Sequence, residues 1–352
     1  MLRFLWTRKL YILAGLVVGT LAAVLVRLGN PPNAGFAPGC FLRDIAGGLG
    51  LHNVGEFQYI RPEIPGFVLG SFITAYAFRE FRARGGSSPI VRFFLGMFMM
   101  AGMLTFVGCP MRAYFRLAGG DLNALTGIAG LIVGVLAGIF FLKRGFSLSR
   151  ATVMSTPTGW IFPLTMVGLL LLLILQPEFI NSSVKGFGSY HAAIGISLGA
   201  GLLVGFIGQR TRLCFSGEWR DALLTKNTWV ITAVASMFLA ALVLNIAFGQ
   251  FSLDFEGQPD AHTNQLWNFL GLFLAGLAAV QVNGCPFRQS IWAGEGNTDA
   301  AVTILGMIAG GALMRGWNLS ACGGTGPPVG GMVAVGIGIA FCVAVGFLFK
   351  GK

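Results

Sequence analysis

Ten apolar segments, most of them close to twenty residues long, follow one another along this chain. A helix needs about 20 apolar residues to cross the hydrocarbon layer of a membrane. Only 11% of the residues are charged, whereas soluble domains carry about 25%. The sequence therefore predicts an all-α, polytopic membrane protein with about 9–10 transmembrane or re-entrant helices. The segments span residues 10–28, 66–82, 93–108, 122–142, 158–176, 190–208, 228–248, 266–283, 299–314 and 328–349.

Two of these segments, 93–108 and 299–314, are short for a full crossing. Glycine and proline lie next to several of the short runs, which indicates broken or re-entrant helices. Irregular backbone is tolerated at membrane depth only where it faces protein or a wet cavity. The apolar stretch from residue 10 lacks a small-x-small cleavage site, so we expect a retained first helix and no cleaved signal peptide.

A pentapeptide occurs twice, as GCPMR at 108–112 and as GCPFR at 284–288, each time after a similar apolar run. This duplication predicts two repeats, with 1–150 as the first half, 151–188 as a linking span and 189–352 as the second half. About five spans separate equivalent points, and an odd number of crossings inverts the second half. We therefore expect two inverted structural repeats whose Cys-Pro-x-Arg units approach the middle of the membrane from opposite sides.

The basic residues predict the orientation. The three long loops at 29–65, 177–189 and 249–265 are rich in acids and poor in Lys and Arg. Basic loops stay in the cytoplasm, so both termini are predicted to be cytoplasmic and the acidic loops external. The net charge of +11 is then a topology signal, and nucleic acid is not an expected partner. The basic groups are Arg3, Arg8 and Lys9; Arg79, Arg82, Arg84 and Arg92; Lys143, Arg144 and Arg150; Arg210, Arg212, Arg220 and Lys226; and Lys350 and Lys352.

Cys109 and Cys285 are the leading candidates for a solute pathway. Each precedes a helix-breaking proline and has an arginine, Arg112 or Arg288, one turn further on. Ionisable residues at membrane depth are costly and usually mark a pathway or a site. The two arginines are expected to hold an anion and to favour the anionic form of the adjacent thiols. A buried cysteine in a membrane helix is otherwise a small, polarisable apolar residue, and we read Cys342 in that way.

Three more cysteines are candidates for the same pathway. Cys40 and Cys214 each precede a phenylalanine at similar places in the two halves. Cys40 is equally well interpreted as an apolar loop residue, and Arg210 and Arg212 before Cys214 as a cytoplasmic anchor. Cys322 lies in a glycine- and proline-rich break and has no counterpart in the first half. No C-x-x-C pair or His/carboxylate cluster occurs, so no metal and no cofactor is expected.

The residues GCPFRQ at 284–289 and AGEGNTDAAVT at 293–303 resemble the YedE-type selenium metabolism membrane proteins, a branch of the YeeE/YedE family of sulfur-compound transporters. The resemblance implies an hourglass-shaped inner-membrane permease that passes thiosulfate or a selenium species inward. It implies transport cysteines at Cys109 and Cys285, less directly at Cys40 and Cys322, and a small cytoplasmic TusA-like sulfur or selenium carrier as a partner. The sequence SACG at 320–323 departs from the selenium branch and leans toward the thiosulfate branch.

Two functions remain open. In the first, a transporter without enzymatic activity, Cys thiols and Arg line a central constriction and the anion crosses unchanged. In the second, a membrane sulfur or selenium transferase or thiol oxidoreductase, a cysteine forms a covalent adduct that a second thiol resolves. The dispersed cysteines favour the first, and arginines beside thiols disfavour a soft-metal permease. Asp121, Glu295 and Asp299 near segment ends are candidates for proton transfer. The sequence leaves open the coupling ion, the transport direction and the oligomeric state.

Overall fold

The computed structural model describes residues 2–351 and the side chains of residues 8–351. The predicted all-α class is confirmed for this part, whose only strands are the two-residue, antiparallel β1 (Arg84–Gly85) and β2 (Thr152–Val153). The side chains of Arg3 and Lys352, which entered the charge argument, lie outside the described part. The helices are α1 (Leu2–Arg27), α2 (Pro38–Gly48), α3 (Glu63–Ala77), α4 (Pro89–Phe106), α5 (Pro110–Ala118), α6 (Asn123–Lys143), α7 (Thr156–Leu175), α8 (Ile194–Thr211), α9 (Gly217–Thr225), α10 (Trp229–Ala247), α11 (Gln265–Gln281), α12 (Pro286–Gly294), α13 (Thr298–Gly316) and α14 (Val329–Leu348), with a 3-10 turn at Phe187–Ser189.

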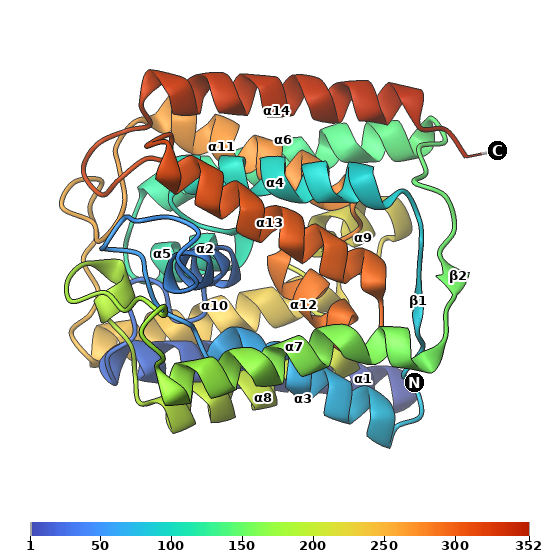
Figure 1. The fold of residues 1–352 in the computed structure, drawn as a ribbon, viewed down its shortest axis with the longest axis horizontal. Helices are drawn as coiled ribbons and strands as arrows, with labels where there is room; N and C mark the ends of the chain where they lie inside the picture. The colour runs from blue at the N-terminus through green and yellow to red at the C-terminus, as the bar shows by residue number, and fades with distance from the viewer. Residues whose placement is uncertain (1, 352) are drawn as a thin grey trace.

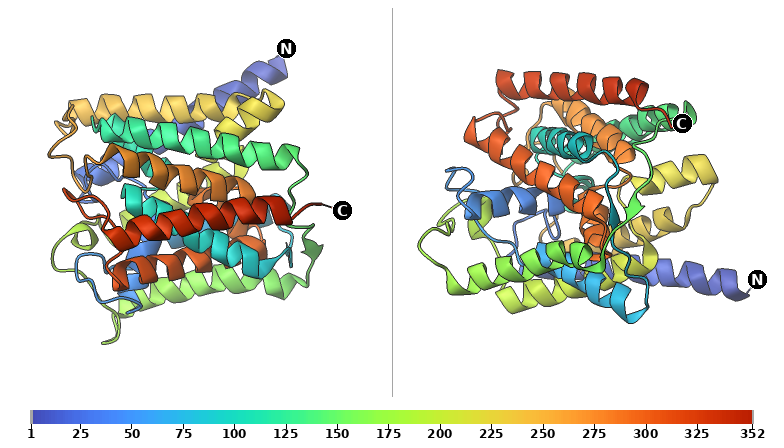
Figure 2. Two further views of the ribbon diagram at one scale, coloured as in Figure 1. Left: turned by 90° about the horizontal axis from the view of Figure 1, so that it is seen from above. Right: turned by 45° about the vertical axis from the view of Figure 1, so that its right-hand side comes forward.

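Long helices form two groups with short helices between them. Figure 1 shows α4, α6, α11, α13 and α14 on one side and α1, α3, α7, α8 and α10 on the other, and Figure 2 gives the same arrangement from two further directions. The short helices α2, α5, α9 and α12 lie between the groups. Helix α1 begins and α14 ends at the same end of the bundle, on the right of Figure 1, which we call the termini end.

Within residues 2–351, eight segments are long and apolar enough to cross a membrane, so the chain is a multi-pass membrane protein. Eight of the ten segments predicted as transmembrane or re-entrant meet this criterion, and the other two are helices that fall short of it. The segment predicted at 66–82 is α3, which has 15 residues, and 299–314 falls in α13, where Asp299 and Arg315 lower the hydropathy. The candidate spans are Arg8–Arg27, Pro89–Ala118, Asn123–Lys143, Thr156–Leu175, Ile194–Thr211, Trp229–Ala247, Gln265–Gly294 and Val329–Leu348.

Two of these spans are broken in the middle, as the proline and glycine pattern predicts. Helix α4 ends where Val107 adopts a left-handed backbone with φ of 60°, and α5 begins at Pro110. Helix α11 gives way to α12 in the same manner, with Asn283 at φ of 68° and Pro286 at the first helical position. Proline fits that position because its missing N–H would have no partner there.

The segment 29–65, which the sequence predicts to be a loop, contains a buried helix. Its residues 38–48 form α2, and every residue of this helix is buried. Asp44 of α2 pairs with its neighbour Arg43 and with Arg61, and none of the three side chains has exposed surface. The acidic residues of this segment are therefore an unreliable guide to solvent exposure, because buried cations pair with Asp44.

Glycines allow the long helices to pack backbone against backbone. A Cβ at Gly130 or Gly134 of α6 would lie 2.1 Å from the carbonyl oxygen of Phe269 or Phe273 on α11. A stripe of small residues lets membrane helices approach this closely. The contact between α13 and α4 has the same form, with Gly306 and Gly310 against the carbonyls of Phe93 and Met97.

Candidate functional site

Four buried thiols come from the helix breaks and from the short helices inside the bundle. Cys109 and Cys285 occupy the residue before α5 and α12, where the backbone is extended. Cys40 lies in the first turn of α2, and Cys214 lies just before α9. All four belong to one continuous hydrophobic core. A core position removes these thiols from lipid and from bulk water.

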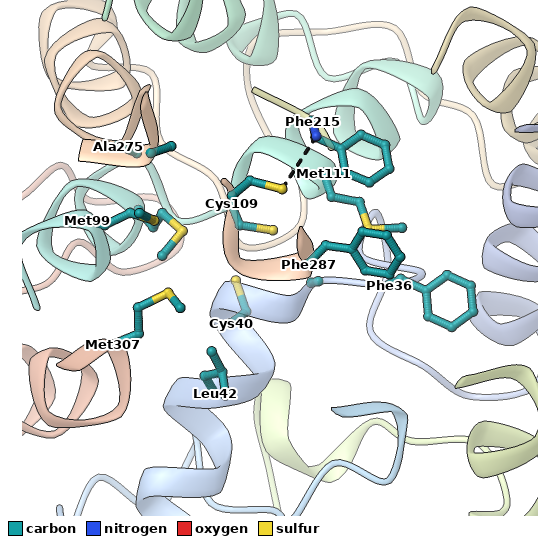
Figure 3. Close-up of a cluster of buried hydrophobic side chains, with 14 of the residues drawn as sticks. Phe36, Cys40, Leu42, Met99, Cys109, Met111, Phe215, Ala275, Phe287 and Met307 are labelled. Atoms are coloured by element: carbon teal, nitrogen blue, oxygen red, sulfur yellow. Dashed lines mark hydrogen bonds between the residues drawn. The ribbon is translucent and has the colours of Figure 1, made fainter. Parts of the chain in front are cut away.

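Cys40 and Cys109 form what we call the first thiol pair. Figure 3 shows their side chains near one another, one on α2 and the other at the break before α5. Gly39 makes this approach possible, because a Cβ there would lie 2.9 Å from the Cβ of Cys109. Met103 packs beside the same glycine. The first pair therefore depends on close contact between α2 and the broken span.

Cys214 and Cys285 form the second thiol pair. The backbone N–H of Phe215 donates to the Cys285 Sγ at 3.4 Å, the dashed line in Figure 3. The backbone N–H of Gly217 donates to the Cys214 Sγ at 3.2 Å at the start of α9. The hydrogen bond from the Cys285 thiol lowers the pKa of Cys214 well below its ordinary range, with help from Arg220 and against burial. Cys214 is thus the thiol of this pair that ionises first.

The remaining two cysteines lie apart from these pairs. Cys322 is half-buried in the break after α13, where the Arg315 Nη1 donates to its Sγ at 3.3 Å. Cys342 is fully buried in α14, and its backbone oxygen accepts from Gln281. All six cysteines are free thiols. Within residues 2–351, no group of three or more His, Cys, Asp or Glu side chains is placed to hold a metal ion.

The guanidinium groups of Arg112 and Arg288 turn away from the thiols beside them in sequence. Arg112 Nη1 donates to the Val107 oxygen at 2.7 Å and to the carboxylate of Asp260 at 3.0 Å, and it reaches Cys40 Sγ at 3.6 Å. Arg288 instead donates to the Gly208 oxygen at 3.5 Å. The fully buried Arg112 therefore meets the first thiol pair through its other member.

Arginine side chains from α2, α5 and α13 gather around the rings of Phe57 and Phe187. Arg43 lies 4.1 Å and Arg315 lies 3.7 Å from the centre of the Phe57 ring. Arg43 and Arg112 also share the Phe187 ring, at 4.7 Å and 5.0 Å. We call Arg43, Arg112 and Arg315 the arginine cluster. Aromatic faces stabilise these cations in a place that water does not reach.

A buried carboxyl group lies near the second thiol pair. Glu218 of α9 is 1% exposed and accepts from the Tyr114 hydroxyl at 2.8 Å. Trp219 donates to the same hydroxyl at 2.9 Å. Burial raises the pKa of Glu218 well above its ordinary range, and the charge of Cys214 raises it further.

Sequence reasoning missed Glu218, Asp260 and the partners Arg43 and Arg315. The acids it proposed for proton transfer have other partners. Asp121 pairs with Arg116 at 2.6 Å, Asp299 accepts from the Ser87 hydroxyl at 2.5 Å, and Glu295 lies between Arg84 and Arg288. The contacts of Asp299 with Ser87 and of Glu295 with Arg84 join distant segments, so local spacing carried no signal for them. The one available hint was an Arg-Asp dipeptide at 43–44 surrounded by apolar residues.

Comparison with known proteins gives two findings. Residues 210–346 match the family model described as sulphur transport. A segment of 104 residues is 33% identical to a protein of Spirochaeta thermophila named thiosulfate transporter TsuA. That segment covers 28% of this chain and 31% of the relative, so the match spans about a third of the curated protein.

Proposed function

We propose that this chain is a membrane permease for thiosulfate or a related sulfur anion, on the premise that residues 210–346 match the sulphur transport family. The observation that carries the proposal is the placement of four buried thiols, two at the breaks of interrupted helices and two on or just before short helices, with the arginine cluster beside the first pair. A similar segment in a protein named a thiosulfate transporter supports the choice of substrate.

The anion would pass from the arginine cluster to the first thiol pair and then to the second. Guanidinium groups offer several N–H donors in a fixed plane, which suits an oxyanion. Thiols are weak donors and polarisable, so they hold a sulfur-containing anion without trapping it. Cys109 and Cys285 are the central contacts in this account, and Cys40 and Cys214 are their partners. Arg112 and Cys322 serve the entrance, and Arg288 serves the other end.

The two halves, 1–150 and 189–352 with 151–188 between them, are proposed to be inverted repeats. The glycine contacts support this arrangement. In α6, Gly130 and Gly134 contact Phe269 and Phe273 of α11. The offset that relates the two Cys-Pro-x-Arg units also relates Gly130 to Gly306 and Gly134 to Gly310. Those glycines meet the equivalent residues of α4 in return. Reciprocal packing of this kind, in which each half contacts the equivalent helix of the other, is expected when two repeats form one substrate site between them.

The proposed location is the inner membrane, with the termini end in the cytoplasm and the arginine cluster facing outside. Basic residues of the loops 79–88, 144–155 and 212–228 favour this orientation. The anion would then move inward, with delivery to a small TusA-like carrier as a further expectation. Selenium analogues of the anion are alternative substrates on the resemblance alone.

A second candidate function follows from the low pKa of Cys214 beside Cys285. A Cys214 thiolate can attack the outer sulfur of thiosulfate, form a persulfide and release sulfite. The S–S bond of thiosulfate breaks as the new S–S bond forms, so no oxidant is needed. Intact-protein mass spectrometry after incubation with thiosulfate distinguishes the functions: a persulfide on Cys214 supports transfer, and unmodified protein during active uptake supports transport.

The experiment that tests the proposal is uptake of labelled thiosulfate by proteoliposomes containing the whole protein. Unlabelled sulfite and selenite serve as competitors. The wild-type protein is expected to accumulate thiosulfate above protein-free vesicles. Wild-type protein that accumulates none, in either orientation of the vesicles, would contradict the proposal.

A further inference from the structure

The arginine cluster holds more hydrogen-bond donors than the protein satisfies. Five of its buried nitrogens have no partner among the described residues: Nη1 of Arg43, Nε and Nη2 of Arg112, and Nε and Nη2 of Arg315. Arg43 and Arg112 have no exposed surface, and Arg315 is 3% exposed. A buried donor without a partner costs about 1–3 kcal/mol, and more when it is charged. The cluster is therefore an incomplete site.

Positive charge also exceeds negative charge around the cluster. Asp44 is shared by Arg43 and Arg61, and Asp121 is taken by Arg116. Arg315 has no carboxylate within ion-pair distance in the described part of the chain, so it depends on Asp260 for compensation. Buried cations without matching anions indicate a place for a mobile anion.

Asp260 is the carboxylate that faces this excess. Its Oδ2 lies 3.0 Å from Arg112 Nη1. Burial raises the pKa of Asp260, but the fields of Arg112, Arg43 and Arg315 outweigh it and the net pKa is lowered. The side chain is 16% exposed, in contrast to the fully buried Arg112. Asp260 thus reaches the cluster from its accessible side.

We infer that the arginine cluster is the first binding subsite for a tetrahedral sulfur oxyanion, and that the Asp260 carboxylate occupies it until the anion displaces it. This inference rests on the proposed function and names the entry site. A carboxylate has two oxygens and satisfies one guanidinium nitrogen here. A sulfur oxyanion has three or four oxygens and reaches the donors that Asp260 leaves free.

The segment that carries Asp260 can move away from the arginine cluster. Asp260 has a left-handed backbone with φ of 48°, which aspartate and asparagine tolerate better than most residues. The neighbouring Gln258 and Pro259 line a cavity of about 480 Å³. Movement of the segment that carries Asp260 toward that cavity would open the cluster without unfolding a helix.

A second loop rests on the same segment. The Gly324 N–H donates to the Ala261 oxygen at 2.7 Å, and a Cβ at Gly323 would lie 3.2 Å from the Cα of Asp260. Cys322, which accepts from Arg315, lies in this loop. Departure of Asp260 therefore loosens both loops, which links binding of the anion to access to Cys322.

The test is the dissociation constant of thiosulfate for the purified full-length protein in detergent, measured by titration calorimetry and compared with uptake by proteoliposomes. Asp260→Asn keeps the backbone preference and removes the charge. It is expected to bind thiosulfate at least five-fold more tightly, because the tethered competitor is lost. Arg315→Lys is expected to bind about ten-fold more weakly, because the planar fork is lost. Glu256→Gln removes an exposed charge from the same loop and is expected to match the wild type.

The outcomes separate this inference from the proposed function. Wild-type protein that neither binds nor transports thiosulfate contradicts the proposed function. Wild-type protein that binds it, together with unchanged or weaker binding by Asp260→Asn, overturns the role of Asp260 alone. Unchanged binding by Arg315→Lys overturns the subsite.

A measurement on the wild-type protein keeps the test valid if a variant does not fold. Hydrogen exchange of the loops at 257–264 and 320–326 is followed with and without thiosulfate. Displacement of Asp260 predicts at least two-fold faster exchange of these loops in the presence of the anion. Slower or unchanged exchange at saturating thiosulfate contradicts displacement.

Discussion

At the scale of single residues, buried polar groups decide how this protein responds to pH. Glu218 has one carboxylate oxygen bonded to Tyr114 and the other without a partner among the described residues. Burying an ionised carboxylate with an oxygen that lacks a partner costs more free energy than burying the neutral acid. The neutral acid is therefore the form that suits the folded protein.

The first prediction concerns stability against pH. The pKa of Glu218 is higher in the folded state than in the unfolded state. Its contribution to the stability of the folded protein is therefore fully present below the unfolded-state pKa and is lost as pH rises through the folded-state pKa. Glu218→Gln stays neutral, so its melting temperature in detergent should fall less between acidic and alkaline pH. The slope removed is about 1.4 kcal/mol per pH unit in that window. The exposed Glu256→Gln should keep the wild-type slope, and an equal slope in Glu218→Gln would refute the assignment.

The second prediction concerns the arginines beside the thiols. Arg112→Lys keeps a positive charge but loses two of the donors that lie free inside the protein. The KM for thiosulfate uptake should rise by about ten-fold, which is about 1.4 kcal/mol. Arg288→Lys should also slow uptake, since Arg288 occupies the equivalent place at the other end. Wild-type kinetics in both variants would make these residues helix anchors.

At the scale of helices, sequence patterns predict what is local and miss what is distant. Proline after cysteine predicts the breaks at 107–110 and 282–286, because proline cannot continue a helix that it follows. The buried helix α2 was missed, since its charged residues look solvent-exposed until Arg61 is seen beside Asp44. The pairing of Cys40 with Cys109 likewise depends on packing that no spacing reveals.

The third prediction tests the packing of these helices. A Cβ at Gly134 would lie 2.1 Å from the Phe273 oxygen on the facing helix, and backbone cannot easily move aside. Gly134→Ala should destabilise the protein by about 1–3 kcal/mol, measured as a lower melting temperature in detergent. Gly168→Ala on α7 has open space around it and serves as the matched control. Equal stability of the two variants would contradict close contact between α6 and α11.

At the scale of the whole molecule, the charge distribution and the two helix groups describe one oriented bundle. The acidic loops at 177–189 and 249–264 lie at one end, and the basic loops lie at the other with both described chain ends. Opposite ends of a permease face different solutions, so this asymmetry bears on the direction of transport.

The fourth prediction is the orientation. Val184, in the loop before α8, is 96% exposed, and Val153, on β2 before α7, is 93% exposed. In intact cells, a membrane-impermeant maleimide should label Val184→Cys at once and Val153→Cys only after permeabilisation. Five of the native cysteines are buried, which keeps the background low. The opposite labelling pattern would reverse the proposed topology.

The most direct test of the central claim is the initial rate of thiosulfate uptake by proteoliposomes containing Cys109→Ala, Cys285→Ala or Cys342→Ala. Loss of one weak thiol contact of about 1 kcal/mol should slow uptake by about five-fold in each of the first two variants. Cys342→Ala should transport like the wild type, because Cys342 packs in α14 away from both thiol pairs. Wild-type rates in Cys109→Ala and Cys285→Ala would remove the thiols from the pathway and contradict the account.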